Sequence, residues 1–171
     1  MTLTAFPNGI SSFGIPQIGS GALPITNGTY YFVCNATGAN GSDGNEGTDM
    51  DAPLATLAQA LTNTTASEND VVVILEGHSE TITGAGGITM SKAGVTVIGL
   101  GNAGQRPRVL MDGATTVTWL ISGANCTVQN VVLAAGHADI VTGIGITAAG
   151  VTLDAVEFVN NVVDENFLSE I

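Results

Sequence analysis

The residues best suited to chemistry in this chain are its carboxylates. Six lie in the region expected to form strands: Glu76, Glu80, Asp112, Asp139, Asp154 and Glu157. Glycoside hydrolysis needs two carboxyl groups at a fixed separation, one acting as acid and the other as base or nucleophile. Asp154 and Glu157 differ by three positions, so a continuous strand would direct them to opposite faces. The spacing therefore predicts no catalytic pair and no catalytic residue.

Histidine, serine and arginine offer no second catalytic arrangement. His78 and His137 each lie beside a glycine in an expected turn, where we predict that both rings are exposed. Ser79 directly follows His78, which does not provide the spatially separated base and nucleophile of a hydrolase triad. Arg106 and Arg108 occupy an expected loop, with no pair of acids predicted opposite them. We therefore predict that the chain is not an enzyme.

Metal and cofactor chemistry is similarly sparse. Cys34 and Cys126 are too few for a disulfide framework, and no Cys/His spacing suits zinc. We expect both thiols to be buried, and we predict no cofactor. A loop over 36–48 and the residues after it crowd hard oxygen ligands, and the calcium candidates there are Asp43, Asn45, Glu46 and Asp49. Their spacing does not match an EF-hand loop, so a solvated turn region remains the alternative.

An internal repeat organises the rest of the chain. Residues 88–97 (ITMSKAGVTV), 119–128 (WLISGANCTV) and 144–153 (IGITAAGVTL) align without a gap. The alignment superposes Thr96, Thr127 and Thr152, then Met90, Ile121 and Ile146, and at the turn Gly94, Asn125 and Gly150. In the same alignment Asp154 is equivalent to Ile98 and Gln129, and Cys126 is equivalent to Val95 and Val151. A weaker fourth copy aligns 70–73 with 94–97, which lie 24 residues later.

Self-similarity at this period is typical of a solenoid, in which each unit buries its apolar side against its neighbours. Two short strands per repeat, joined by a Gly or Asn turn, and repeat lengths that vary by several residues favour a parallel β-helix. We therefore predict an all-β chain, a short parallel β-helix of about four rungs over 29–161. The tail over 162–171 either covers the open end or engages a partner.

A helix over about 53–64 is expected within this domain. Asp51 is a suitable N-cap, and Pro53 suits the first helical turn. An apolar stripe follows, formed by Leu54, Leu57, Ala58 and Leu61. Because the first rung of a β-helix exposes unpaired backbone, we predict that this amphipathic helix covers it.

Residues 1–28 form an apolar arm without charged side chains. Three prolines and five glycines exclude a long helix, and the bulky side chains are too many for a solvated linker. The candidate binding residues of this arm are Phe6, Ile10, Phe13, Ile15, Ile18 and Leu23. Two alternatives stay open: the arm folds back on its own domain, or it docks on a partner or a neighbouring subunit.

The charge balance excludes several kinds of partner. Three basic residues stand against fifteen acidic ones, a net charge of −12. Such a surface repels phosphate backbones and anionic lipid, so we predict neither nucleic acid nor membrane partners. No stretch approaches the roughly 20 apolar residues of a membrane span, and the N-terminus lacks the features of a signal peptide. We expect synthesis in a host cytoplasm without export by that route.

The segment TYYFVCNATGANGSDGNEGT, followed by APLATLAQAL, resembles the opening of the pectate-lyase-like family of right-handed parallel β-helices. The resemblance covers about 29–161 and implies a right-handed coil. That family includes polysaccharide lyases and hydrolases, and also bacteriophage tailspikes and head proteins without catalysis.

The start of the chain, FPNGISSFGIPQIGSG, resembles N-terminal segments of bacteriophage structural proteins. Together the two resemblances imply a virion protein on the capsid surface, a decoration (cement) subunit that docks on the lattice of the major capsid protein and stabilises it. By analogy with such proteins, a homotrimer is expected. The alternative is a tailspike or fibre fragment that binds or depolymerises polysaccharide.

Overall fold

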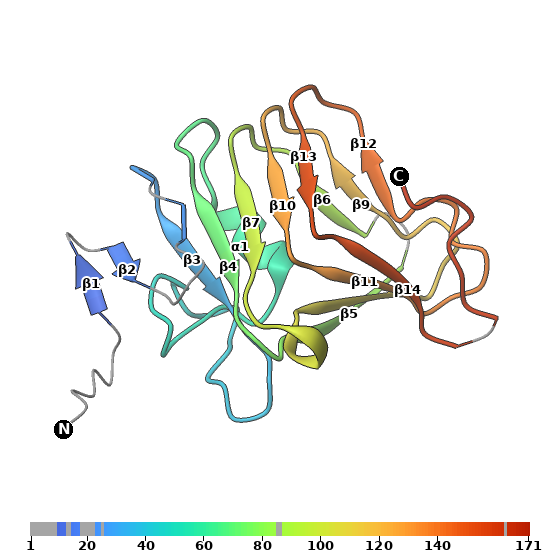
Figure 1. Ribbon diagram of the computed structural model, residues 1–171, viewed down its shortest axis with the longest axis horizontal. Helices are drawn as coiled ribbons and strands as arrows, with labels where there is room; N and C mark the ends of the chain where they lie inside the picture. The colour runs from blue at the N-terminus through green and yellow to red at the C-terminus, as the bar shows by residue number, and fades with distance from the viewer. Residues whose placement is uncertain (1–9, 13–14, 18–22, 25, 85–86, 163) are drawn as a thin grey trace.

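The computed structural model describes residues 10–12, 15–17, 23–24, 26–84, 87–162 and 164–171, the first two segments by their backbone alone (Figure 1). Most of the strands belong to three parallel sheets. Their spatial orders are β13-β10-β7-β4-β3 in the first sheet, β14-β11-β8-β5 in the second and β12-β9-β6 in the third. The chain is therefore an all-β protein built on parallel sheets, as the sequence predicts.

The strands are short and evenly spread along the chain. The first sheet contains β3 (Tyr30–Val33), β4 (Val71–Ile74), β7 (Thr96–Gly99), β10 (Thr127–Gln129) and β13 (Thr152–Asp154). The second contains β5 (Ser79–Thr83), β8 (Arg108–Asp112), β11 (Val132–Ala135) and β14 (Glu157–Asn160), and the third β6 (Ile88–Met90), β9 (Trp119–Ile121) and β12 (Ile144–Ile146). Outside them lie an antiparallel pair, β1 (Ile10–Ser12) and β2 (Ile15–Gln17), the helix α1 (Leu57–Asn63) and a 3-10 turn, η1 (Ala103–Gln105).

After β3 the chain visits the sheets in a constant order: first, second, third. We call each such visit a circuit, so that β4-β5-β6, β7-β8-β9 and β10-β11-β12 are the first three circuits and β13-β14 begins the fourth. Consecutive circuits pair in parallel in every sheet, and Figure 1 shows them following one another from left to right. Each circuit therefore contributes the next strand of each sheet.

The register of these pairs confirms the predicted alignment of three repeats. Thr127 pairs with both Thr96 and Thr152, and Ile121 pairs with both Met90 and Ile146. The predicted fourth copy is wrong by one residue, because Val71 pairs with Thr96 instead of Val95. The run 71–74 is buried on both faces, so it lacks the alternation that would have set its register.

The turn that precedes the strand of the first sheet has the same backbone conformation in every circuit. Asn69, Gly94, Asn125 and Gly150 all have positive φ, at 60°, 76°, 56° and 73°. Glycine and asparagine are the residues that adopt this conformation most readily. The turn positions predicted from the repeat are thus confirmed, and Asn69 extends them to the first circuit.

The core lies between the sheets and is formed by columns of equivalent side chains from successive circuits. Val72, Val97 and Val128 form one column in the first sheet, each with no exposed surface. Trp119 is fully buried and pairs with Ile88 and Ile144 on its two sides. The thiols Cys34 and Cys126 are also buried, as predicted.

The helix is shorter than expected and begins later. Its N-cap is Thr56, whose hydroxyl accepts from the Gln59 amide, so the prediction of Asp51 as N-cap is wrong. Leu54 instead extends the first sheet, since it accepts a hydrogen bond from the Cys34 amide and donates one to the Phe32 carbonyl. The helix contacts β3, β4 and β6 and buries Leu57, Ala60 and Leu61. Ala58, predicted in the apolar stripe, is exposed.

The tail returns to the last part of the coil. Phe167 bridges to Ile140 in parallel, and its ring meets that of Phe158 edge to face at 5.6 Å. Within the described residues, the one α-helix is far too short to cross a membrane.

Candidate functional site

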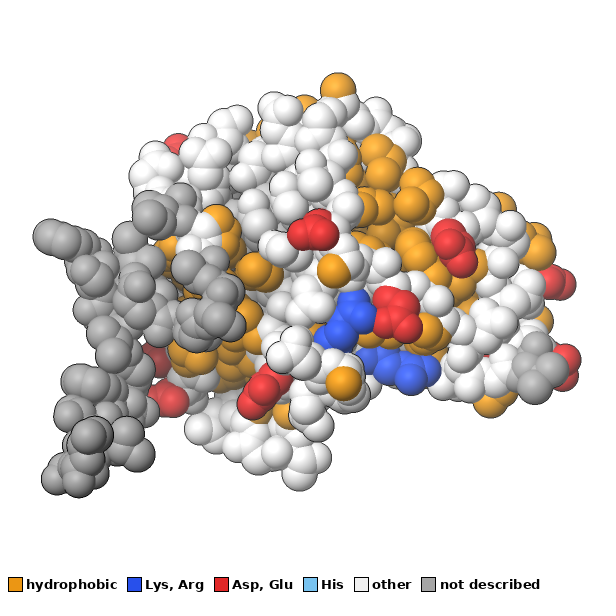
Figure 2. Space-filling view, viewed as in Figure 1, with side chains coloured by type: hydrophobic (Ala, Val, Ile, Leu, Met, Phe, Trp, Pro, Cys, Tyr) orange, Lys and Arg blue, Asp and Glu red, His pale blue; other side chains and the backbone are white. Residues whose placement is uncertain are grey.

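The outer side of the first sheet carries an apolar surface at the N-terminal end of the molecule. Its side chains point away from the core because they alternate with the buried column of the same strands. We call this surface the outer apolar face; it consists of Tyr30, Phe32, Val71, Val73, Leu75, Ile98 and Leu100, packed with Leu23. Figure 2 shows orange side chains on this side of the molecule, next to the grey residues that are not described.

The outer apolar face is confined to the first circuits. Along one column of the sheet, Phe32, Val73 and Ile98 are followed by Gln129 and then Asp154. The Gln129 amide donates to the Asp154 carboxylate at 2.9 Å, so the far end of the column is polar. The apolar part therefore coincides with the end from which the N-terminal segment departs.

Residues 23–24 and 26–29 attach the start of the domain to this face. Leu23 is only 3% exposed, and the Tyr30 hydroxyl donates to the Pro24 carbonyl at 2.7 Å. The Thr29 amide donates to the Asp70 carboxylate at 2.7 Å, which ties the segment to the turn before β4. Leu23 thus packs on its own domain, the first of the two alternatives for the arm.

The other arm residues are placed less fully. Ile10 and Ile15 lie in β1 and β2, which pair antiparallel with each other. Phe6, Phe13 and Ile18 lie outside the described residues. The strand pairing within the arm was not predicted.

A shallow groove of about 440 Å³ adjoins the outer apolar face. It runs across the repeated turns and is lined by Pro24, Thr26, Ser67, Asn69, Val71, Ala93, Gly94, Thr96 and Asn125. No charged side chain lines it. Its hydroxyl and carboxamide groups suit a neutral polar ligand.

Three of the calcium candidates, Asp43, Asn45 and Asp49, form hydrogen bonds within the protein. Asp43 accepts from the amides of Ala55 and Thr56 and from the Thr56 hydroxyl, all within 3.0 Å. Asn45 donates to the carbonyls of Asn40 and Pro53, and Asp49 accepts from the Asp51 amide. A hollow of about 240 Å³ is lined by Asn45, Glu46, Gly47, Thr48, Asp49 and Ala52. Across the described chain, no three His, Cys, Asp or Glu side chains gather as metal ligands.

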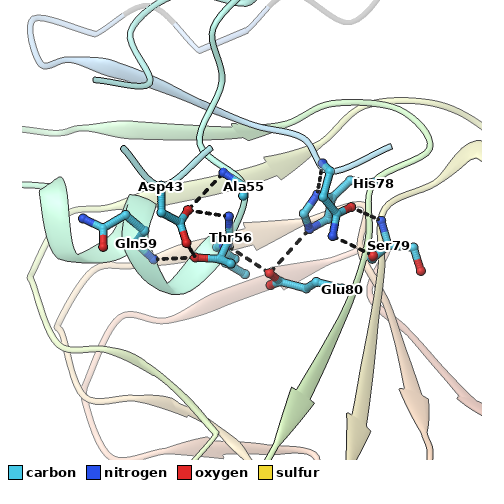
Figure 3. Close-up of polar contacts among 9 residues, drawn as sticks. Asp43, Ala55, Thr56, Gln59, His78, Ser79 and Glu80 are labelled. Carbon is cyan, nitrogen blue, oxygen red and sulfur yellow. Dashed lines mark hydrogen bonds and ion pairs between the residues drawn. The ribbon is translucent and has the colours of Figure 1, made fainter. Parts of the chain in front are cut away.

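A buried polar centre lies under the start of α1 (Figure 3). The prediction that His78 is an exposed turn residue is wrong, because its ring is 1% exposed. Its Nδ1 accepts from the Asn35 amide at 3.2 Å, which leaves the proton on Nε2 when the ring is neutral. Nε2 faces Glu80 Oε2 at 3.7 Å, and that same oxygen accepts from the Leu57 amide at 3.2 Å. His137 is half-buried.

Glu80 occupies an inward position, equivalent by register to the core residue Val109. Its Oε1 and the His78 Nε2 have no hydrogen-bond partner within the described residues. A histidine beside a carboxylate could move a proton, but both side chains are buried. The pair is therefore best explained as an internal support for the start of the helix.

The remaining acids and arginines bind one another across circuits. Arg106 pairs with Glu157 at 2.5 Å and donates to the Ala155 carbonyl, and Arg108 donates to the Asn161 carboxamide at 2.7 Å. Figure 2 shows the blue basic side chains beside red acidic ones. Asp154 and Glu157 lie on different strands, β13 and β14, with one bound to Gln129 and the other to Arg106. These contacts hold the fourth circuit to the two before it.

The outer apolar face was missed from the sequence, although a signal was present. The run Val71–Ile74 is apolar at every position, which indicates burial on both faces of a strand. That burial requires a cover outside the sheet, and the nearest uncharged apolar segment is the arm.

Comparison of the chain with protein-family models, curated proteins and solved structures found no match in any of the three.

Proposed function

We propose that the three sheets form a short right-handed parallel β-helix of about four rungs, in which each circuit is one rung. The constant order of visits to the sheets, and a register that repeats from circuit to circuit, support this proposal. In this arrangement α1 is the N-terminal cap, because it lies against the first strands of the first and third sheets. The right-handed winding is the expectation from the family resemblance.

We further propose that the protein is a non-enzymatic structural component of a virion, a bacteriophage capsid decoration protein. It would dock on the lattice of the major capsid protein, stabilise it and remain on the capsid surface after synthesis in the host cytoplasm. The virion setting comes from the resemblance of the opening segment to bacteriophage structural proteins. The molecular role rests on the arm.

One observation carries this role: an uncharged apolar segment departs from an apolar face. Leu23 packs against side chains of β3 and β4, and the 22 residues that precede it carry no charged side chain. Burying a bulky apolar side chain contributes roughly 1.5 to 3 kcal/mol, so several such residues could hold a subunit on its neighbour. Ordering the segment offsets part of this gain.

The charge distribution limits the partner. A net charge of −12 disfavours nucleic acid and anionic lipid, and we propose a protein lattice or sister subunits as the partners. We propose a homo-oligomer, with a trimer expected by analogy with other virion β-helices.

Polysaccharide binding, as in a tailspike or fibre fragment, is the second candidate. The uncharged groove lined by Asn69, Thr96 and Asn125 favours it, since such side chains bind sugar hydroxyls. Release of reducing ends from capsular polysaccharide, or retention on a polysaccharide column that Asn69→Ala and Asn125→Ala abolish, would support this function over decoration.

The proposed role is tested by size-exclusion chromatography with light scattering on the full chain and on a chain that begins at Leu23. Starting at Leu23 retains the residue that covers the outer apolar face. A full-length control carries Phe6→Ser, Phe13→Ser and Ile18→Ser, which keeps the arm's length and removes its bulk. If the full chain is an oligomer and both altered chains are folded monomers of 17.2 kDa or less, the arm is an assembly element. If all three proteins, the full chain included, are monomers, the proposed role of the arm in assembly is refuted.

A further inference from the structure

The two ends of the coil are covered to different degrees. At the first circuit α1 packs on β3, β4 and β6, and Leu54 and Asn35 bond to the edges of β3 and β5. At the C-terminal end of the coil β12, β13 and β14 are the outermost strands of their sheets. Within the described residues, their cover is the tail, whose backbone bonds to Ile140, Gly143 and Ile144. Among the described strands, none pairs with the outer edge of β13.

Core side chains are exposed at this end. We call it the open end and define it by Ile146, Val151, Leu153, Val156 and Phe158. The residues one circuit earlier at the same positions are Ile121, Cys126, Val128, Val131 and Leu133, all with 0% exposure. Ile146 by contrast is 38% exposed, and the other four are half-buried. Figure 2 shows hydrophobic side chains on the surface in the region of β12 and β13.

The backbone of β13 also presents free hydrogen-bonding groups. The Thr152 amide donates to Cys126, and the Asp154 carbonyl accepts from Asn130, so these two residues face β10. Because alternate residues of a parallel strand face opposite neighbours, Leu153 directs its N–H and C=O to the outer edge. An edge of this kind pairs readily with a strand from another chain.

Charge selects the strand that could occupy this edge. Five acids lie on or beyond the last strands (Asp154, Glu157, Asp164, Glu165 and Glu170), of which Glu157 is paired with Arg106, and no Lys or Arg follows Arg108 in the chain. The folded surface of a second copy is itself acidic and would be repelled. Residues 1–42 carry no charged side chain, so this N-terminal segment meets no such repulsion as it approaches the acidic end.

The same segment already has strand conformation. The backbones of β1 and β2 form an antiparallel pair, which leaves an outer edge on each strand. Figure 1 shows this pair beside β3, at the opposite end of the molecule from β13 and β14. A contact between the pair and the open end therefore joins two copies head to tail, through two different surfaces.

We propose that the β1–β2 pair of one copy adds to the open end of a second copy and continues the first sheet beyond β13. The inference rests on the proposed function, in which the arm is an assembly element, and it names the surface that receives the arm. Strand addition would cover Leu153 and its half-exposed neighbours and satisfy the free edge. A head-to-tail contact repeats from copy to copy, and it produces a closed ring or an open filament according to the rotation between copies.

The test measures the molar mass of full-length variants by sedimentation equilibrium. An arm variant, Ile10→Asp/Ile15→Asp, places acids opposite the acidic end, and its control Ile10→Thr/Ile15→Thr retains uncharged, strand-forming residues. An end variant, Ile146→Lys/Thr152→Lys, places charges on exposed positions of β12 and β13 and so blocks edge pairing. Its control, Met50→Lys/Thr81→Lys, makes the same charge change at exposed positions elsewhere. Far-UV circular dichroism and Trp119 fluorescence verify folding.

We expect the wild type and both controls to have a multiple of the 17.2 kDa chain mass, and the arm and end variants to have that mass alone. Combining the arm and end variants in one chain should restore association at low salt, since acids then meet lysines. A monomeric arm variant with a fully associated end variant would overturn the inference and leave the proposed function intact. Full association of both variants, or a monomeric wild type, would overturn both.

Discussion

Asn125 and Gly150 occupy the same corner of consecutive circuits, and the Asn125 carboxamide lies where a β-carbon on Gly150 would project. Both residues have positive φ. Asn69 and Gly94 have the same relationship two circuits earlier, with the Asn69 carboxamide 3.4 Å from a β-carbon built on Gly94. Asparagine thus alternates with glycine along this corner, and each carboxamide fills the space that its glycine leaves open.

Gly150→Ala should destabilise the protein by about 1 to 2 kcal/mol, because an L-residue with positive φ is strained by that amount. Collision with Asn125 adds to the cost. Gly104→Ala is the matched control, since a β-carbon there meets nothing within 4 Å, and it should change stability by less than about 0.5 kcal/mol. Urea unfolding followed by the fluorescence of buried Trp119 gives both values, and equal stabilities would contradict the account of the corner.

Asp43→Ala should cost about 1 to 2 kcal/mol, because the carboxylate accepts three hydrogen bonds at the entry to α1 and such a cap contributes in this range. Asp43→Asn should recover part of the loss, since one oxygen can still accept from the Ala55 and Thr56 amides. Asp49→Ala removes an equally exposed acid with a single local bond and should be nearly neutral. A large effect at Asp49 would instead point to a role for the 43–51 loop beyond capping.

His78→Leu and Glu80→Leu should each destabilise by about 1 to 3 kcal/mol, because each leaves a buried polar partner unmatched. The double variant should lose less than the sum of the two, since it removes both groups from the core. Glu76→Leu, at an exposed position of the same turn, is the control. Additive losses in the double-mutant cycle would show that the two side chains do not interact.

Cys126 should react with thiol reagents only as the protein unfolds, because burial raises the pKa of its thiol above the ordinary value. The folded state then favours the neutral thiol. The stability that depends on this is complete below the unfolded pKa of about 8.5 and falls as the pH rises toward the folded pKa. Cys126→Val, which copies Val95 and Val151 in the neighbouring circuits, should abolish this alkaline loss, as urea unfolding between pH 7 and 10 would reveal.

Elements repeated in the sequence could be predicted residue by residue. The pairing of Thr96 with Thr127 and the glycine at 94 followed from local patterns that each circuit reproduces. The first circuit does not follow the pattern, because β4 is covered on both faces and its strand carries no alternation. Its register was therefore predicted one residue out.

The centre under α1 depends on contacts between residues far apart in the chain. His78 is buried because Asn35, 43 positions earlier, bonds to its ring. The helix begins at Leu57 because Thr56 caps it locally and because Asp43 and Glu80, which are distant in the chain, bind the amides at its start. The sequence prediction relied on Asp51 as N-cap and Pro53 in the first turn, and it therefore placed the start of the helix too early.

The proposed assembly requires contact between the arm of one copy and a second copy, and hydrogen exchange on the full wild-type chain tests this directly. Exchange is measured at a low and a high protein concentration for the amides of β1, β2 and Leu153. We predict that these amides exchange more slowly at high concentration, while those of buried strands such as β7 are unchanged. Rapid exchange of the arm and Leu153 amides at every concentration would contradict the proposed assembly.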